Sequence, residues 1–94
     1  MDKNEVLNKM RELLADIKPS PQLAKLDGST TFFSLGLDEF DFIEMVMLLE
    51  EAYNLVIEDQ QFALDSTIDS LFLHMAEQEA KLKQLATDLG ATKS

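Results

Sequence analysis

Residues 35–59 constrain the fold of this chain more than any other stretch. They read LGLDEFDFIEMVMLLEEAYNLVIED, which predicts a Leu-Gly turn, an acidic helix and a short extended exit. Asp38 is expected to cap the helix, because its side chain can accept hydrogen bonds from the first free backbone amides. Asp41 adds negative charge at the positive end of the helix dipole. The helix is expected to end near Tyr53, with Asn54 as a left-handed stop.

This helix carries two apolar stripes side by side. The first stripe, which suits the core, is Met45, Val46, Leu49 and Tyr53; the second is Phe40, Ile43 and Met47, and Phe42 lies outside both. One buried face does not need so much apolar surface. Either the helix packs between two neighbours, or the second stripe is exposed among acids as a protein-docking surface. The residues that we assign to this docking surface are Asp38, Asp41, Phe42, Ile43, Glu44, Met47, Glu50 and Glu51.

The charge of the chain is unevenly distributed. The net charge is −10, and no Lys or Arg occurs between Lys25 and Lys81, an interval that holds 13 of the 18 carboxylates. Such a surface repels nucleic acids and anionic lipids and attracts proteins that carry a basic patch. We therefore predict protein partners with basic patches and no nucleic-acid ligand. Solubility alone is the alternative explanation of the acidic surface.

Upstream of the acidic helix, the pattern predicts a first helix and a long loop. Apolar residues recur every three or four positions over residues 4–17, which is typical of an amphipathic helix. Pro19 ends this helix, because it disfavours helical geometry in the residue before it. The loop over residues 19–37 is expected to be pinned to the core by Phe32 and Phe33.

Downstream, the pattern predicts a short third helix at residues 60–64 and a long last helix. The sequence Ser-Thr-Ile-Asp at residues 66–69 resembles a capping box that starts the last helix, and Gly90 is expected to end it. The chain is therefore predicted to be all-α, with a single domain over residues 1–89 and a frayed tail over residues 90–94.

The second half of the last helix extends beyond what a small core can cover. Leu82, Leu85 and Leu89 continue its apolar period. This half is expected to pack back on the first helix, to bind a partner helix or to pair with a second copy through residues 79–89. One and a half heptads are too few to choose among these outcomes.

The chain offers little catalytic or metal-binding chemistry. It has no cysteine, which excludes disulfides, thiolate metal sites and a cysteine nucleophile. The only histidine, His74, shares a side of the last helix with Thr67, Ser70 and Gln78 and is expected to be a solvated surface residue. We predict no metal site and no enzyme. No apolar run reaches about 20 residues and the first residues lack signal-peptide features, so we expect a cytoplasmic protein without a membrane span.

Residues 35–59 resemble the signature helix of acyl carrier proteins. The likeness extends over roughly residues 5–75, and its most specific parts are Leu35-Gly36-Leu37-Asp38, Asp41, Glu44, Val46-Met47, Leu49-Glu50-Glu51, Tyr53 and residues 57–59. The resemblance implies an up-down four-helix bundle of acyl carrier type, with a short third helix. It also implies that the second helix meets basic patches on partners such as acyl-carrier-dependent synthases and transferases.

Two positions depart from the family: Glu39, and Phe40 after it, where a small aliphatic residue is usual. In acyl carrier proteins a serine follows the aspartate and takes the phosphopantetheine arm, whereas here Glu39 follows Asp38. A carboxylate cannot replace that serine, since the transfer needs a hydroxyl to attack the pyrophosphate of coenzyme A. No cofactor is therefore expected, and 4'-phosphopantetheine only if the natural protein has serine at position 39. Ser34 lies in the loop outside any match to the attachment motif.

Three explanations of Glu39 stay open. The chain is a carrier-like module that acts by protein recognition, or it is a functional carrier in fatty-acid, lipid or polyketide-like synthesis whose serine is replaced in this sequence. The third explanation, which is compatible with either of these, is that Glu39 stabilises the helix start, by about 0.3–1 kcal/mol. A helical oligomerisation module built on the last helix is the alternative from another functional class.

Overall fold

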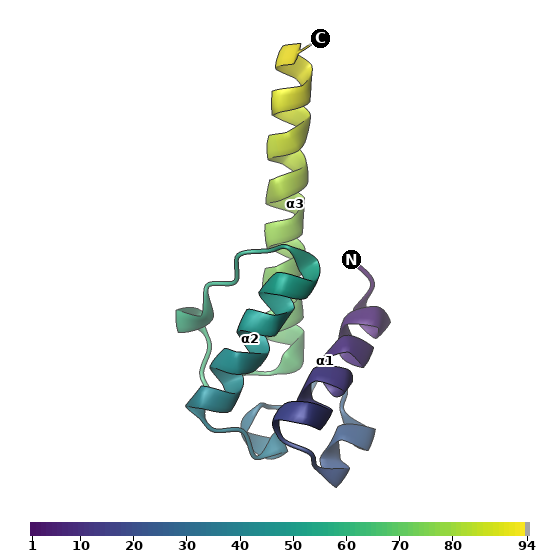
Figure 1. The fold of residues 1–94 in the computed structure, drawn as a ribbon, viewed down its shortest axis with the longest axis vertical. Helices are drawn as coiled ribbons and strands as arrows, with labels where there is room; N and C mark the ends of the chain where they lie inside the picture. The colour runs from purple at the N-terminus through teal and green to yellow at the C-terminus, as the bar shows by residue number, and fades with distance from the viewer. Residues whose placement is uncertain (94) are drawn as a thin grey trace.

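The computed structural model describes the backbone of residues 1–93 and the side chains of residues 1–89, and this part of the chain is all-α. Its helices are α1 (Lys3–Ile17), α2 (Glu39–Tyr53) and α3 (Ile68–Lys93), and its 3-10 turns are η1 (Pro21–Lys25), η2 (Phe33–Leu35) and η3 (Asp59–Gln61). In Figure 1, α1 and α2 lie side by side in front of the first half of α3, and the second half of α3 projects away from them.

One hydrophobic core joins the three helices and the long loop. Its most deeply buried side chains are Val6, Met10, Leu14, Phe32, Met45, Val46, Leu49, Ile68, Leu71 and Met75. The stripe of Met45, Val46 and Leu49 therefore faces the core, as the sequence predicts. At the centre, the ring of Phe32 meets the ring of Phe42 edge to face, with 4.9 Å between their centroids, a geometry that aromatic pairs prefer.

Arg11 fastens the long loop to α1. Its guanidinium donates hydrogen bonds to the carbonyl oxygens of Leu23, at 3.3 Å, and Leu26, at 2.8 Å. Phe32 is fully buried and holds the next part of the loop, as predicted. The prediction is wrong for Phe33, whose side chain is 71% exposed. The chain enters η2 at this point, and the two neighbouring rings consequently point in different directions.

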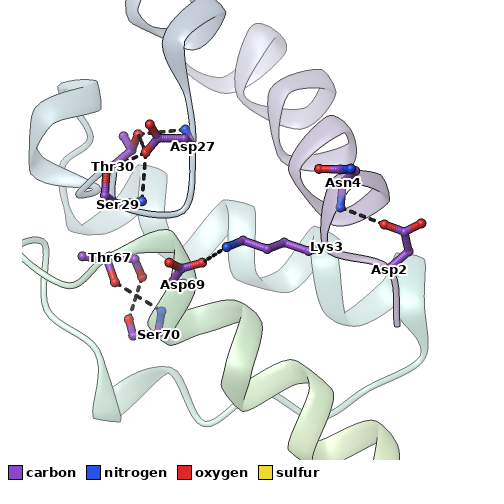
Figure 2. A network of polar contacts seen from close by, with 9 residues as sticks. All are labelled: Asp2, Lys3, Asn4, Asp27, Ser29, Thr30, Thr67, Asp69 and Ser70. Carbon is purple, nitrogen blue, oxygen red and sulfur yellow. Dashed lines mark hydrogen bonds and ion pairs between the residues drawn. The ribbon is translucent and has the colours of Figure 1, made fainter.

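The loop also pairs with the segment that leads into α3. The amide of Ile68 donates to the carbonyl of Thr30 at 2.9 Å, and the amide of Asp69 donates to the carbonyl of Gly28 at 2.8 Å. Figure 2 shows Lys3 of α1 reaching the carboxylate of Asp69 at the same place. The start of α3 is thus tied to both the loop and α1.

The cap of α3 lies one residue later than predicted. The hydroxyl oxygen of Thr67 accepts a hydrogen bond from the amide of Ser70 at 3.2 Å (Figure 2). Ser66 is used elsewhere, because its hydroxyl oxygen accepts from the amide of Ala63 at 3.1 Å. Thr67, rather than Ser66, therefore caps α3, which begins at Ile68.

The predicted third helix is reduced to the single turn η3. The segment after η3 is not helical, and one of its backbone groups bonds to the loop instead: the carbonyl of Leu64 accepts a hydrogen bond from the amide of Phe33 at 2.6 Å. At the other end of the chain, α3 continues through Gly90 to Lys93. Glycine in a helix costs only about 1 kcal/mol relative to alanine, and no proline follows to stop the helix. The tail predicted over residues 90–94 is therefore helical up to Lys93, and Ser94 lies outside the described residues.

Candidate functional site: the exposed face of α2

A reciprocal capping box fixes the start of α2. The carboxylate of Asp38 accepts from the amide of Asp41 at 2.8 Å, and the carboxylate of Asp41 accepts from the amide of Asp38 at 3.1 Å. Gly36, in the left-handed conformation with φ 77°, turns the chain into this box. The result is a defined helix start at which Glu39, the first helical residue, is exposed.

The second apolar stripe of α2 is exposed. Phe40 is 82% exposed and Met47 is 61% exposed, and Ile43 lies between them on the same face. Glu44 and Glu51 are exposed on the same helix. Of the two interpretations of this stripe, the structure supports exposure among acids rather than packing between two neighbouring helices.

Not all of the residues assigned to the docking surface lie on it. Phe42 is buried against Phe32, so its assignment to the surface is wrong. Glu50 is half-buried, and its carboxylate accepts from the amide of Ile57 at 2.9 Å, which ties the exit segment to the helix end. Asp41 is half-buried in the capping box. The assigned residues that are exposed are Asp38, Ile43, Glu44, Met47 and Glu51.

A cleft of about 580 Å³ opens beside Glu39, between the first half of α2 and the segment over residues 59–65. Its apolar walls are Phe33, Phe42, Ile43, Phe62, Ala63 and Leu64, and its polar rim is Glu39, Asp59, Gln60 and Asp65. The periodicity of the sequence does not predict this cleft. The only signal for it is that Phe33 adjoins a core residue in a loop close to Glu39.

His74 supports the wall of this cleft from behind. The prediction of a solvated surface histidine is wrong, because His74 is buried. Its Nε2 accepts a hydrogen bond from the amide of Glu58 at 3.1 Å, and its ring packs edge to face on Phe62 with 5.5 Å between centroids. The sequence signal is its spacing, since His74 lies three residues after Leu71 and directly before Met75, which are both buried.

We expect the substitution His74→Phe to lower the free energy of unfolding by about 1–3 kcal/mol, because the amide of Glu58 loses its acceptor. Urea denaturation followed by circular dichroism measures this change. His74→Gln is the matched control, since its side-chain oxygen can accept the same hydrogen bond. A His74→Phe protein as stable as the original would show that the hydrogen bond contributes little.

The described part of the chain shows neither a metal-binding group nor a membrane span. Within residues 1–93, no group of three or more acidic or histidine side chains is placed to hold a metal ion. Over the same residues, no helix combines the length and hydrophobicity that a membrane span requires.

The structure defines a small all-α domain whose second helix starts after a Leu-Gly turn and presents an acidic, partly apolar face. Sequence comparison places it in a family: the family model described as "Phosphopantetheine attachment site" matches residues 5–74. The chain therefore belongs to the family of phosphopantetheine-binding, acyl carrier domains. Members of this family are carrier proteins rather than enzymes, in agreement with the prediction from sequence.

Curated acyl carrier proteins are similar to this chain. Acyl carrier protein 2, chloroplastic, of Spinacia oleracea is 30% identical over 66 residues, which cover 70% of this chain and 51% of that protein. The protein of the same name from Hordeum vulgare is 30% identical, with 71% and 52% covered. The acyl carrier protein of Rubrobacter xylanophilus is 27% identical, with 84% and 98% covered. The chain thus spans about half the length of the two plant relatives. No solved structure matches it significantly.

Proposed function

We propose that this chain is an acyl-carrier-like module that docks on partner proteins through the exposed face of α2 and carries no phosphopantetheine arm at position 39. The observation that carries the proposal is the exposed stripe of Phe40, Ile43 and Met47 beside the carboxylates of Glu44 and Glu51. An apolar centre with charged surroundings is the usual composition of a transient protein interface.

The partner is expected to combine a basic patch with an apolar group. No Lys or Arg lies between Lys25 and Lys81, so α2 and the cleft present carboxylates without compensating cations. Complementary charge would speed encounter and set the orientation of docking. The apolar walls of the cleft beside Glu39 suit an uncharged group of the partner, flanked by arginine or lysine that meets Glu39, Asp59 and Asp65. Synthases and transferases that act on acyl carriers fit this description.

Glu39 is the residue that separates a recognition module from a carrier. It stands where the resemblance places the attachment serine, at the first position of α2. Its carboxylate is exposed but has no hydroxyl proton to lose in an attack on coenzyme A. Its charge instead lies at the positive end of the helix dipole, where it is stabilising.

Intact mass spectrometry tests this proposal directly. The protein is incubated with coenzyme A, Mg²⁺ and a promiscuous phosphopantetheinyl transferase, and a carrier that has the serine is the positive control in the same reaction. We expect no mass gain for this chain while the control gains one arm. A gain of one arm would overturn the proposal, and peptide mapping would then decide whether Ser34 is the acceptor.

A functional acyl carrier in fatty-acid, lipid or polyketide-like synthesis is the second candidate. The cleft favours it, since an apolar hollow beside position 39 could shelter an acyl chain. This candidate requires serine at position 39 in the natural protein, or attachment elsewhere. The intact mass of the protein purified from its native host separates the two candidates, because only a functional carrier would bear an arm there.

Charge reversal on α2 should weaken docking without affecting the fold. We expect Glu44→Lys to raise the dissociation constant for an acyl-carrier-dependent transferase by about tenfold and to flatten its salt dependence, because Glu44 is an exposed acid beside the stripe. Titration calorimetry at two salt concentrations measures both effects. Glu77→Lys, an exposed acid on α3, is the matched control. Equal weakening by both substitutions would mean that only net charge matters, and loss of folding would mean that Glu44 is structural.

A further inference from the structure

The second half of α3 carries an apolar face, and the bundle does not cover this face at Leu82 and Leu85. The structure extends 52 Å along its long axis and 24 and 21 Å across, because this half projects from the bundle (Figure 1). Leu82 and Leu85 are about half exposed, at 46% and 56%. The helix does not fold back on α1; where it leaves the bundle, the amino group of Met1 lies 3.1 Å from Oε1 of Glu79. The outcome in which this half packs on the first helix is therefore wrong.

A hollow of about 150 Å³ lies at the base of this projection. It is lined by Gln78, Lys81, Leu82 and Leu85 of α3, and by Val56 from the segment after α2. The four α3 residues have the spacing i, i+3, i+4 and i+7. In coiled coils, four residues on one helix form the hole that receives a single side chain of the facing helix. The four α3 residues at the hollow therefore have the spacing of a hole in knobs-into-holes packing.

We propose that α3 of a second copy of this chain occupies this face, in antiparallel orientation, so that two copies pair through residues 78–89. In this register Leu82 of each copy faces Leu85 of the other, and Leu85 of the second copy enters the hollow. The pairing uses the same side chains twice, as a two-fold symmetric interface requires.

The charges beside the leucines favour this occupant. Lys81 and Asp88 hold equivalent positions seven residues apart on the same side of the Leu82 and Leu85 seam, so antiparallel pairing brings Lys81 of each copy beside Asp88 of the other. Within the described side chains, Lys81 has no carboxylate partner of its own. Such flanking pairs select orientation in helix pairing. By symmetry, the Lys81–Asp88 salt bridge would form twice across the interface.

The net charge of the bundle favours the same orientation. Residues 79–89 contain two acids and two lysines and are neutral, whereas the whole chain carries −10. Parallel pairing would place two strongly acidic bundles side by side, within the roughly 10 Å over which charges act at 0.1 M salt. Antiparallel pairing places them at opposite ends of the paired helices. Repulsion therefore acts against the parallel arrangement and much less against the antiparallel one.

Sedimentation velocity and equilibrium on the full chain test the pairing, from about 10 µM to about 1 mM, the range of weak specific contacts. We expect a monomer at the low end and a dimer at the high end. Leu82→Glu plus Leu85→Glu should weaken dimerisation by at least about tenfold. The matched control is Leu73→Glu plus Thr87→Glu, which adds the same charge at exposed positions of α3 away from the seam and should dimerise as before. Circular dichroism verifies that each variant is folded.

A charge exchange tests the orientation independently of the leucines. Lys81→Glu should weaken dimerisation, because it sets two carboxylates against each other, and the double change Lys81→Glu plus Asp88→Lys should restore it. A monomer at every concentration would overturn the proposal, and so would a dimer that survives the leucine changes. Failure of the exchange to restore pairing would overturn the antiparallel register. If the protein with the original sequence stays monomeric but binds an amphipathic helix of another protein, the face is a binding site for that protein instead.

Discussion

Phe32→Ala is expected to lower the free energy of unfolding by about 3–5 kcal/mol, the usual loss when a buried phenylalanine is truncated. Phe32 is fully buried, and its ring packs edge to face on Phe42 of α2. It also lies where the long loop meets the segment before α3, since its amide donates to the carbonyl of Ser66 at 3.3 Å. Small domains have only about 5–15 kcal/mol of stability, so this loss would remove a large share of it.

The neighbouring residue provides the matched control. Phe33→Ala removes the same ring from a side chain that is mostly exposed, and we expect a change within about 0.5 kcal/mol. Urea denaturation of the two variants in parallel measures the difference. Equal losses would mean that Phe33 also packs in the core in solution, and a negligible loss at Phe32 would contradict the described packing of the loop.

Which of Phe32 and Phe33 is buried cannot be predicted from the sequence. Both phenylalanines lie in a loop without periodicity, and nothing in the sequence distinguishes the buried ring from the exposed one. The distinction arises when η2 turns the chain and the amide of Phe33 bonds to the carbonyl of Leu64, thirty-one residues away in sequence. The acceptor role of His74 likewise depends on Glu58 in a distant segment, although the spacing of His74 from Leu71 already indicates burial.

The features that sequence predicted well are local ones. The cap at Asp38, the charge of Asp41 in the first turn and the left-handed stop at Asn54, with φ 53°, all depend on neighbouring residues. The bounds of α2 follow from these residues, and those of α1 follow from its apolar period and from Pro19 after it. The prediction of a third helix is wrong, because the carbonyl of Leu64 in this segment bonds to the loop. The predicted cap of α3 is one residue too early, because the hydroxyl of Ser66 bonds to the amide of Ala63.

The exposure of one face of α2 is predictable in part from the sequence. Helical periodicity alone separates the stripe of Phe40, Ile43 and Met47 from the core stripe, and the structure exposes it. Periodicity leaves Phe42 between the two stripes, and only the position of Phe32 decides that it is buried. From sequence, Glu50 is expected to be a surface acid. In the structure its carboxylate accepts a hydrogen bond from the amide of Ile57 in the exit segment.

Glu39→Ser is expected to change the chain from one that takes no phosphopantetheine to one that is loaded with a single arm. The substitution supplies the hydroxyl that the transfer requires, at an exposed position held by the capping box of Asp38 and Asp41. Cap and dipole interactions at a helix start contribute about 1 kcal/mol each, so the loss of one carboxylate should leave α2 folded. Intact mass after incubation with coenzyme A and a promiscuous transferase gives the result as presence or absence of one arm.

Two further variants make the loading experiment decisive. Glu44→Ser places a hydroxyl at another exposed acidic position of the same helix and should gain nothing, which shows that position 39 itself is recognised. Phe40 stands where the family usually has a small aliphatic residue, so Glu39→Ser plus Phe40→Leu tests whether the large, exposed ring obstructs the transferase. If neither serine-39 variant is loaded, position 39 is not equivalent to the attachment site. If both are loaded and the original is not, the single residue Glu39 separates this domain from a carrier, while α2 keeps the surface through which a transferase recognises it.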